Sequence, residues 1–239
     1  MTGGISFRRK KTLVGRMFER MHAAFGPLHW WPAETFDELV IGVVLTQNTN
    51  WGNVERALAR LKEAEALSLA AVLKMRRERL ARLIRPAGYF NVKAERLQAV
   101  ARFFVEERGA DPRALRRLEQ AQLRQELLGV HGLGPESVDS ILLYGLDQSV
   151  FVIDAYTLRI GARHGLFPAG TKYAAAQELF ERCLASDAAM FNEYHAALVR
   201  VGHRYCKPRP ACADCPLNRR SLFLDPAAAP ESACVNRSV

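Results

Sequence analysis

A single carboxylate, Asp154, ends an apolar run in residues 151–156 (FVIDAY), just before a new helical stretch. An aspartate in this place predicts an N-cap, whose side chain accepts a hydrogen bond from an N–H group in the first helical turn. A carboxylate held there can also stabilise positive charge that develops during a reaction. Taken alone it is more often only a cap, and the residues before it decide between the two roles.

Those preceding residues, 122–145, show leucines at helical spacing, an interruption VHGLG at residues 130–134, and a second apolar helical pattern. Gly132 and Gly134 can take positive φ, and Pro135 suits the first turn of a helix. The pattern predicts a helix-hairpin-helix, whose free N–H groups bind phosphate. Such an element holds a nucleic-acid backbone without reading its bases, which favours a catalytic role for Asp154.

Three cysteines lie within ten residues near the C-terminus, in the order Cys206-x5-Cys212-x2-Cys215. Thiolates at this density, stiffened by neighbouring prolines, predict a metal site. The spacing alone does not separate an iron–sulfur cluster from zinc.

Composition indicates a folded, basic protein. The 239 residues are 49% hydrophobic and carry a formal net charge of +9, with a pI near 9.6. This balance favours a polyanionic partner such as DNA, or an anionic membrane surface. No apolar run approaches the ~20 residues of a membrane span, and no signal-peptide core follows the basic N-terminus. We therefore expect no membrane-spanning segment and a cytoplasmic location.

Helical patterns run through the chain, and no stretch alternates as a strand would. Thr35 is placed to cap a nearly apolar helix, with Glu38 at the capping-box position. Further helices are expected over residues 54–61, 67–75, 171–184 and 187–205, the last one capped by Asp187. The predicted fold is all-α with two helical lobes, one over residues 36–149 and one made of residues 1–35 and 150–239.

Gly88 is followed by Tyr89, Phe90 and, shortly after, Lys93. A bendable backbone, an aromatic ring and a cation are what a loop needs to enter a base stack and lie close to phosphate. Aromatic residues in loops are more often core anchors, so the pattern alone leaves both roles open.

The hairpin followed by Asp154 resembles the helix-hairpin-helix (HhH-GPD) DNA glycosylase superfamily, which includes endonuclease III. The resemblance implies a six-helix barrel over residues 36–149, with the hairpin at 122–145, and a second lobe that carries a C-terminal cluster loop. It makes Asp154 the catalytic residue, lets Gln47 fill the gap left by a flipped base, and puts Tyr89 into the duplex. The implied partner is double-stranded DNA with a damaged base, bound between the lobes by a monomer.

Two positions depart from known branches of that superfamily. Bifunctional endonuclease III enzymes have a lysine that forms a Schiff base at the position of Glu136, and a carboxylate cannot do this. AP lyase activity by that route is therefore not expected. The adenine-specific branch needs a glutamate at the position that corresponds to Gly42, so that specificity is also not expected.

The segments WWP, LTQNTNW, GYFNVKA, GVHGLGPES and VFVIDAYTLR are similar to the bacterial 3-methyladenine DNA glycosylase branch. In that branch aromatic side chains stack on the extruded base, and the matching residues are Trp30, Trp31, Pro32 and Trp51, with Glu136 nearby. The expected function is a monofunctional glycosylase for alkylated purines. Two alternatives stay open: an endonuclease III paralogue for oxidised pyrimidines with weak or no lyase activity, and a non-catalytic protein that binds damaged DNA.

The same resemblance favours a [4Fe–4S] cluster over zinc or no metal at Cys206, Cys212 and Cys215. The usual fourth ligand position holds Ser221, and the first gap is one residue shorter than in endonuclease III. Cys234 is the favoured fourth ligand. Cys183 is the other candidate, although it is expected to pack as a small apolar side chain.

Overall fold

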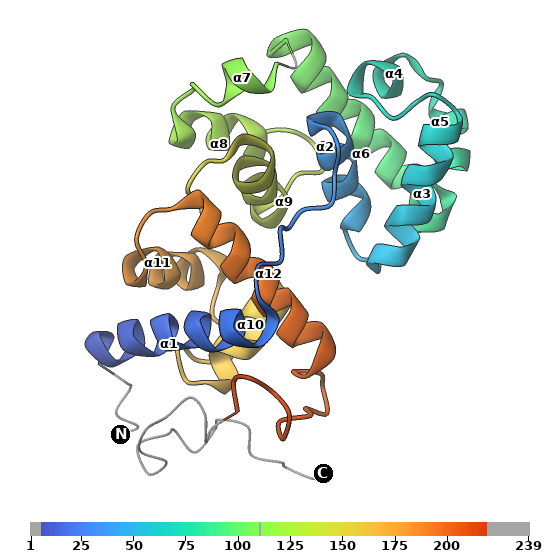
Figure 1. Ribbon diagram of the computed structural model, residues 1–239. Coiled ribbons are helices and arrows are strands. Elements are labelled where there is room, and N and C mark those ends of the chain that lie inside the picture. The colour runs from blue at the N-terminus through green and yellow to red at the C-terminus, as the bar shows by residue number, and fades with distance from the viewer. Residues whose placement is uncertain (1–5, 110, 219–239) are drawn as a thin grey trace. The chain divides into compact units, whose positions relative to one another are not determined.

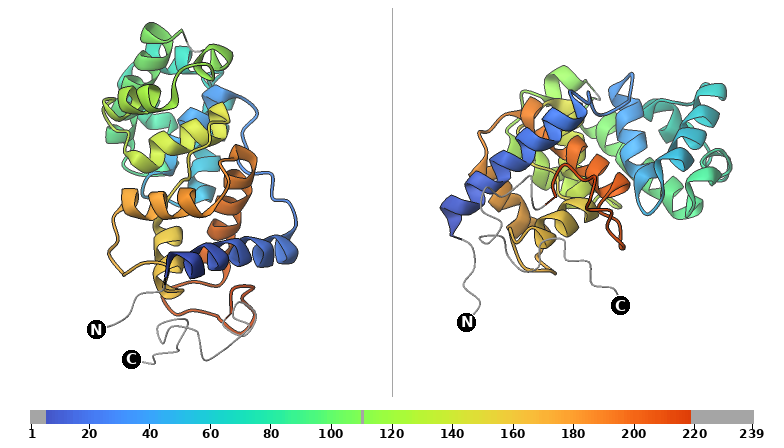
Figure 2. Two further views of the ribbon diagram at one scale, coloured as in Figure 1. Left: turned by 90° about the vertical axis from the view of Figure 1, so that its left-hand side faces the viewer. Right: turned by 60° about the horizontal axis from the view of Figure 1, so that its bottom comes forward.

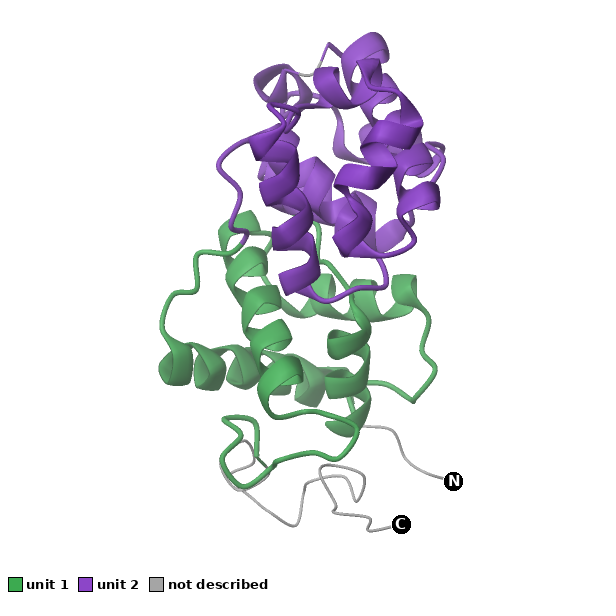
Figure 3. Ribbon diagram, turned by 90° about the vertical axis from the view of Figure 1, so that its right-hand side faces the viewer, with its two compact units in different colours: residues 1–30, 149–239 green, residues 31–148 purple. Residues whose placement is uncertain are grey.

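A computed structural model describes residues 6–109 and 111–218, which fold into helices and connecting segments without a strand. The all-α prediction is confirmed. The chain divides into two compact units: unit 1 comprises residues 1–30 and 149–239, and unit 2 comprises residues 31–148 (Figure 3). The sequence had placed these boundaries at residues 35/36 and 149/150.

Helix α2 (Phe36–Thr46) is the centre of unit 2, because its residues 39–45 are all buried. Apolar side chains on every face let it pack against several other helices at once. Thr35 Oγ1 accepts the Glu38 N–H at 3.1 Å, which confirms the predicted cap. Around it lie α3 (Trp51–Glu63), α4 (Leu69–Lys74), α5 (Arg77–Leu83), α6 (Phe90–Arg102), α7 (Pro112–Leu115), α8 (Gln120–Leu128) and α9 (Pro135–Ser140) (Figure 1).

Short irregular helices complete unit 2. They are the 3-10 turn η1 (Arg85–Ala87) and two π-helical segments, η2 (Phe103–Glu107) and η3 (Ile141–Gly145). Pro86, Pro112 and Pro135 each lie in the first turn of a helical segment. Since proline is tolerated there and not in a helix interior, the path is broken into more pieces than the six helices that the resemblance implied.

Unit 1 consists of α1 (Phe7–Phe25), α10 (Ala155–Arg163), α11 (Tyr173–Cys183) and α12 (Ala188–Arg204) (Figure 2). Helix α12 packs on α1 and α10, and its predicted cap is confirmed, since Asp187 accepts the Met190 N–H at 3.0 Å. A Cβ at Gly202 would lie 2.3 Å from a ring carbon of Tyr156. A residue without a side chain therefore lets α10, the helix that Asp154 caps, lie close against α12.

No helix in the described residues is both long enough and apolar enough to cross a membrane.

Candidate active site and nucleic-acid interface

Asp154 is fixed at the start of α10. Its Oδ1 accepts the Thr157 N–H at 2.6 Å, which confirms the predicted N-cap, and the residue is only 9% exposed. The carboxylate is thus held in one orientation by the helix that follows it, before any substrate binds.

His195 of α12 is the neighbour of Asp154 that the sequence analysis missed. Its Nε2 lies 3.9 Å from Asp154 Oδ1, and its side chain is buried. Burial lowers the pKa of His195, while the negative charge of Asp154 raises it, and the lowering dominates. A neutral imidazole leaves the charge of Asp154 available for chemistry. No local pattern links residues 41 positions apart, so only packing shows this pair.

The hairpin lies between α8 and α9, and its close backbone turn is at Gly132, whose φ is +94°. Gly134 has φ of −103° and serves as the N-cap of α9, so of the two glycines only Gly132 uses the positive φ that glycine allows. A Cβ at Gly132 would lie 2.2 Å from Cγ of Arg96, because the arginine stem covers the turn. The turn therefore needs glycine both for its φ and for space.

Gln47, which follows α2, holds the hairpin in place. Its Nε2 donates to the Gly132 carbonyl at 2.9 Å and to Ser137 Oγ at 3.1 Å. Arg96 of α6 donates to Gln47 Oε1 at 2.6 Å. The predicted role of Gln47 in filling the gap of a flipped base would require these bonds to open. Arg96 was not among the predicted site residues.

A buried ion pair joins the two hairpin helices. Arg124 of α8 donates to both carboxylate oxygens of Asp139 of α9, at 2.7 and 3.0 Å, and the Asp139 side chain is fully buried. A two-bond contact of this kind fixes relative orientation as well as distance. It keeps the hairpin N–H groups in one geometry.

Tyr89 lies at the tip of the turn before α6. It is 72% exposed and has φ of +46°, a left-handed conformation that is uncommon for a tyrosine. Gly88, with φ of +69°, precedes it, and Val92 is exposed beside it. The ring is therefore not a core anchor and is free to meet a partner surface, as a wedge residue must be.

Lys93 requires a correction. Its side chain is 1% exposed, and its ammonium donates to the carbonyls of Leu45 and Ala87, both at 2.8 Å. Burial and, secondly, repulsion by Arg96 lower its pKa to about 8. The structure does not place this ammonium on a surface that phosphate can reach; instead it ties α6 to the end of α2.

Three aromatic rings meet in unit 2. The Trp31 and Trp51 ring centroids are 5.3 Å apart at an interplanar angle of 88°, and Trp31 and Tyr144 are 5.4 Å apart. A Cβ added at Gly42 would lie 3.6 Å from Nε1 of Trp31, so a longer side chain there would meet the indole. Trp30, the other tryptophan of the WWP segment, belongs to unit 1.

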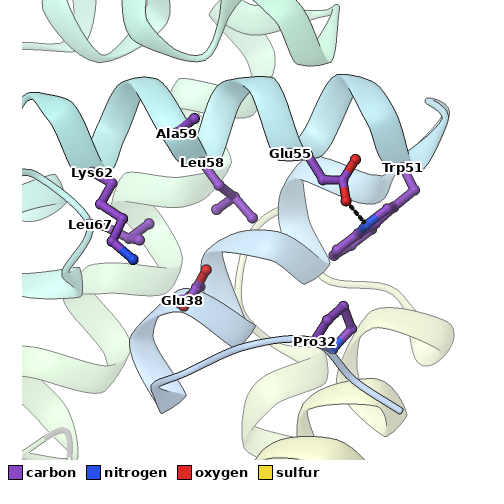
Figure 4. A pocket seen from close by; sticks show the side chains of 8 residues that line it. All are labelled: Pro32, Glu38, Trp51, Glu55, Leu58, Ala59, Lys62 and Leu67. Carbon is purple, nitrogen blue, oxygen red and sulfur yellow. Dashed lines mark hydrogen bonds between the residues drawn. The ribbon is translucent and has the colours of Figure 1, made fainter. Parts of the chain in front are cut away.

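A pocket of about 230 Å³ opens beside Trp51 (Figure 4). Trp51 and Pro32, two of the predicted base-pocket residues, are in its wall, whereas Trp30, Trp31 and Glu136 are not. Glu136 is exposed in the first turn of α9. The full lining is Pro32, Glu38, Trp51, Glu55, Leu58, Ala59, Lys62 and Leu67.

The cysteine loop is attached to α10 by side chains of that helix. Arg159 Nε donates to the Cys206 carbonyl at 2.7 Å, and Arg163 donates to Cys206 Sγ at 3.2 Å. His164 Nε2 lies 2.9 Å from the Leu217 carbonyl. The loop is thus connected to the helix that Asp154 caps.

The described residues do not assemble a complete metal site. Burial raises the pKa of the Cys215 thiol to about 11, and the nearby Cys206 and Cys212 also raise it. No group of three or more Cys, His, Asp or Glu side chains in residues 6–109 and 111–218 is arranged to hold a metal ion. Cys183 is buried in α11, where its charged neighbours include Lys10 and Lys11 of α1. Ser221 and Cys234 lie outside the described residues.

Comparison with known proteins adds the family. The model of the family described as "HhH-GPD superfamily base excision DNA repair protein" matches residues 41–185. The chain is 41% identical over 214 residues to a Methanocaldococcus jannaschii protein named "Putative DNA repair glycosylase MJ1434", covering 89% of this chain and 97% of that protein.

Two solved structures have a similar fold. The H. pylori 3-methyladenine DNA glycosylase bound to 1,N6-ethenoadenine is 24% identical, with a TM-score of 0.68 over 82% of this chain and 97% of that chain. A trapped endonuclease III–DNA covalent intermediate is 18% identical, with a TM-score of 0.75 over 89% and 94% of the two chains.

Proposed function

The chain belongs to the HhH-GPD superfamily of base excision DNA repair proteins, and from this premise we propose that it is a monofunctional DNA glycosylase that releases alkylated, positively charged purines such as 3-methyladenine. The observation that carries the alkyl-base preference is the aromatic cluster of Trp31, Trp51 and Tyr144 next to a pocket lined by Trp51 and Pro32.

The chemistry of the substrate matches such a pocket. An N3-alkylated adenine in DNA carries positive charge, which is attracted to the face of an indole ring. The same charge makes the base a good leaving group, so less transition-state stabilisation by the enzyme is needed to break its glycosidic bond. A neutral damaged base is attracted less strongly to indole rings and is a poorer leaving group.

Asp154 supplies the catalytic charge in this proposal. Positive charge develops on the deoxyribose as the base departs, and a carboxylate fixed in advance stabilises it without reorganising. The bond from Thr157 and the low exposure of Asp154 supply that fixed orientation. Asp154 can also orient a water molecule toward the anomeric carbon, and the product is then an abasic site.

Strand cleavage is not part of the proposal. A lyase step needs an amine that forms a Schiff base, and Glu136 offers a carboxylate at the start of α9. Lys93, which has a lowered pKa, is buried with its ammonium bonded to two carbonyls. Neither residue provides an accessible amine.

The hairpin is proposed to hold the DNA backbone, with Tyr89 entering the duplex. The turn at Gly132 is held by Gln47, which Arg96 in turn contacts. The exposed ring of Tyr89 is available to separate bases. Separating them costs roughly a few kcal/mol, and the cost is smallest at a damaged base. Double-stranded damaged DNA is the proposed partner, bound by a monomer.

A [4Fe–4S] cluster remains a proposal for the cysteine loop. Three cysteines in one loop support it, and the favoured fourth ligand, Cys234, lies outside the described residues. Iron and acid-labile sulfide analysis of anaerobically purified protein, with the visible spectrum, tests it. About four irons per chain and their loss in a Cys206→Ser/Cys212→Ser variant are expected; zinc, or no metal, would reject it.

The experiment that tests the function compares base release from two duplexes, one with 3-methyladenine and one with an oxidised pyrimidine. Strand breaks are scored before and after hot alkali. Release of the methylated base, with breaks only after alkali, is expected. Breaks at the oxidised pyrimidine without alkali would favour an endonuclease III-like activity, and no release from either duplex would favour a binding protein.

Asp154→Asn is the matched control for catalysis. Asparagine is also a good N-cap, so the bond from Thr157 and the start of α10 are retained. Base release should fall by about 10²-fold or more, while affinity for damaged duplex stays close to that of the wild type. Loss of both together would show that Asp154 acts through the fold.

A further inference from the structure

Glu55 lies one helical turn after Trp51 on α3, and the two side chains are joined. Trp51 Nε1 donates to Glu55 Oε1 at 2.9 Å, and both residues line the pocket of about 230 Å³ (Figure 4). The carboxylate therefore fixes the edge of the indole that forms part of the wall. It also places negative charge within the wall itself.

From this geometry we propose that Glu55 makes the pocket selective for bases that carry a positive charge. The inference rests on the proposed function and specifies its substrate class. A cationic base is attracted by two groups. One is the face of the indole ring, and the other is the Glu55 carboxylate that accepts the N–H at the edge of the same ring. A neutral base of similar size gains only stacking and apolar contact.

The other charged groups in the pocket wall leave its net charge negative. Glu38 adds a second carboxylate, whose Oε2 accepts the Glu34 N–H at 3.0 Å. Lys62 is the cation among the lining residues, and its ammonium is paired with Glu34 at 3.2 Å. Since Glu34 is not part of the lining, the wall itself keeps two carboxylates and one lysine. The pocket therefore has a net negative wall.

Glu55→Gln is the sharpest test, because glutamine keeps an oxygen that can accept the Trp51 N–H and removes only the charge. The quantity to measure is the ratio of kcat/KM for 3-methyladenine to kcat/KM for 1,N6-ethenoadenine, which is neutral. Removing one charge at this partly exposed site should lower the ratio by about tenfold. Glu55→Asp keeps the charge, and its ratio should lie between those of Glu55→Gln and the wild type.

Glu63→Gln is the matched control, since Glu63 is an exposed glutamate at the end of the same helix and is not in the pocket wall. It makes the same change in net charge and should leave the ratio within about twofold of the wild type, because the charge of an exposed carboxylate outside the pocket wall is screened by solvent.

A second readout avoids turnover. In an Asp154→Asn background, Glu55→Gln should weaken binding to the duplex with the cationic base by about the same factor relative to the ethenoadenine duplex. An equal fall in affinity for both duplexes would show that Glu55 only positions Trp51. Unchanged affinities for both would show that the charge of Glu55 does not contribute to binding. Either result overturns the inference. If the wild type releases neither base and binds neither damaged duplex in preference to the other, the proposed function itself fails.

Discussion

Burial of Lys93 should make the stability of the protein depend on pH in a predictable direction. The pKa of Lys93 is lowered from 10.5 to about 8, first by burial and second by Arg96. Because one pKa unit corresponds to about 1.36 kcal/mol, the folded state holds this proton about 3 kcal/mol less tightly than the unfolded state does.

The sign follows from proton linkage. Below pH 8 both states are protonated, and the folded state carries the full cost of the buried ammonium. Between about pH 8 and 10.5 the unfolded state binds more protons, so the contribution of Lys93 to the free energy of unfolding rises with pH. Above that window the cost is gone.

Lys93→Met removes the charge and keeps the length of the side chain. The variant leaves the Leu45 and Ala87 carbonyls without their donor, a loss of about 1–3 kcal/mol each that does not vary with pH. The stability difference, wild type minus variant, should therefore grow by up to about 3 kcal/mol between pH 7.5 and 10.5. Lys74→Met, at an exposed lysine, is the control and should show no such growth.

Urea unfolding followed by far-UV circular dichroism, at several pH values across this range, measures that difference. Comparing each variant with the wild type at the same pH removes the contributions of tyrosines and cysteines that ionise in both proteins. A wild-type minus Lys93→Met difference that stays constant across the range would refute the reasoning, since it would mean that Lys93 binds its proton equally well in both states.

Three further predictions concern the hairpin and the surfaces near it. Gly132→Ala should lower the free energy of unfolding by about 1–3 kcal/mol, because its Cβ would meet the Arg96 stem and its φ is +94°; a thermal shift under 1 °C, roughly, would contradict this. Tyr89→Ala should leave stability within about 0.5 kcal/mol, since the ring is 72% exposed, yet weaken base release from duplex more than from single-stranded DNA; an equal effect on both would reject the wedge role. Glu136→Lys should permit borohydride trapping of a DNA adduct if that position reaches the sugar, and no adduct with active protein would show that it does not.

Several site features follow from local rules, and for these the sequence was sufficient. Asp154 and Thr35 cap helices because each is a small polar residue before an apolar helical pattern, and the bonds to Thr157 and Glu38 N–H groups lie within three residues. The hairpin was predicted in the same way, from two apolar helices, an intervening glycine pair and a proline at the first turn.

The features that the sequence analysis missed depend on residues far apart along the chain. Gln47 bonds to Gly132 and Ser137, which are 85 and 90 residues away, and His195 reaches Asp154 from another helix. The sequence predicts Lys93 close to phosphate, because a lysine near an exposed turn is usually solvated. Its two acceptors, the carbonyls of Leu45 in α2 and Ala87 in η1, reach it because both elements pack against α6.

The sequence by itself determined the helical class, the capping residues, the hairpin and the family, because each depends on residue types at short, fixed spacing. The tertiary structure alone decided which polar side chains are buried, that Lys93 ties two helices together, and that Glu55 and Trp51 share a pocket with Pro32. The physical reason is that burial, desolvation and charge pairing depend on which helix faces meet, and short-range patterns do not encode that.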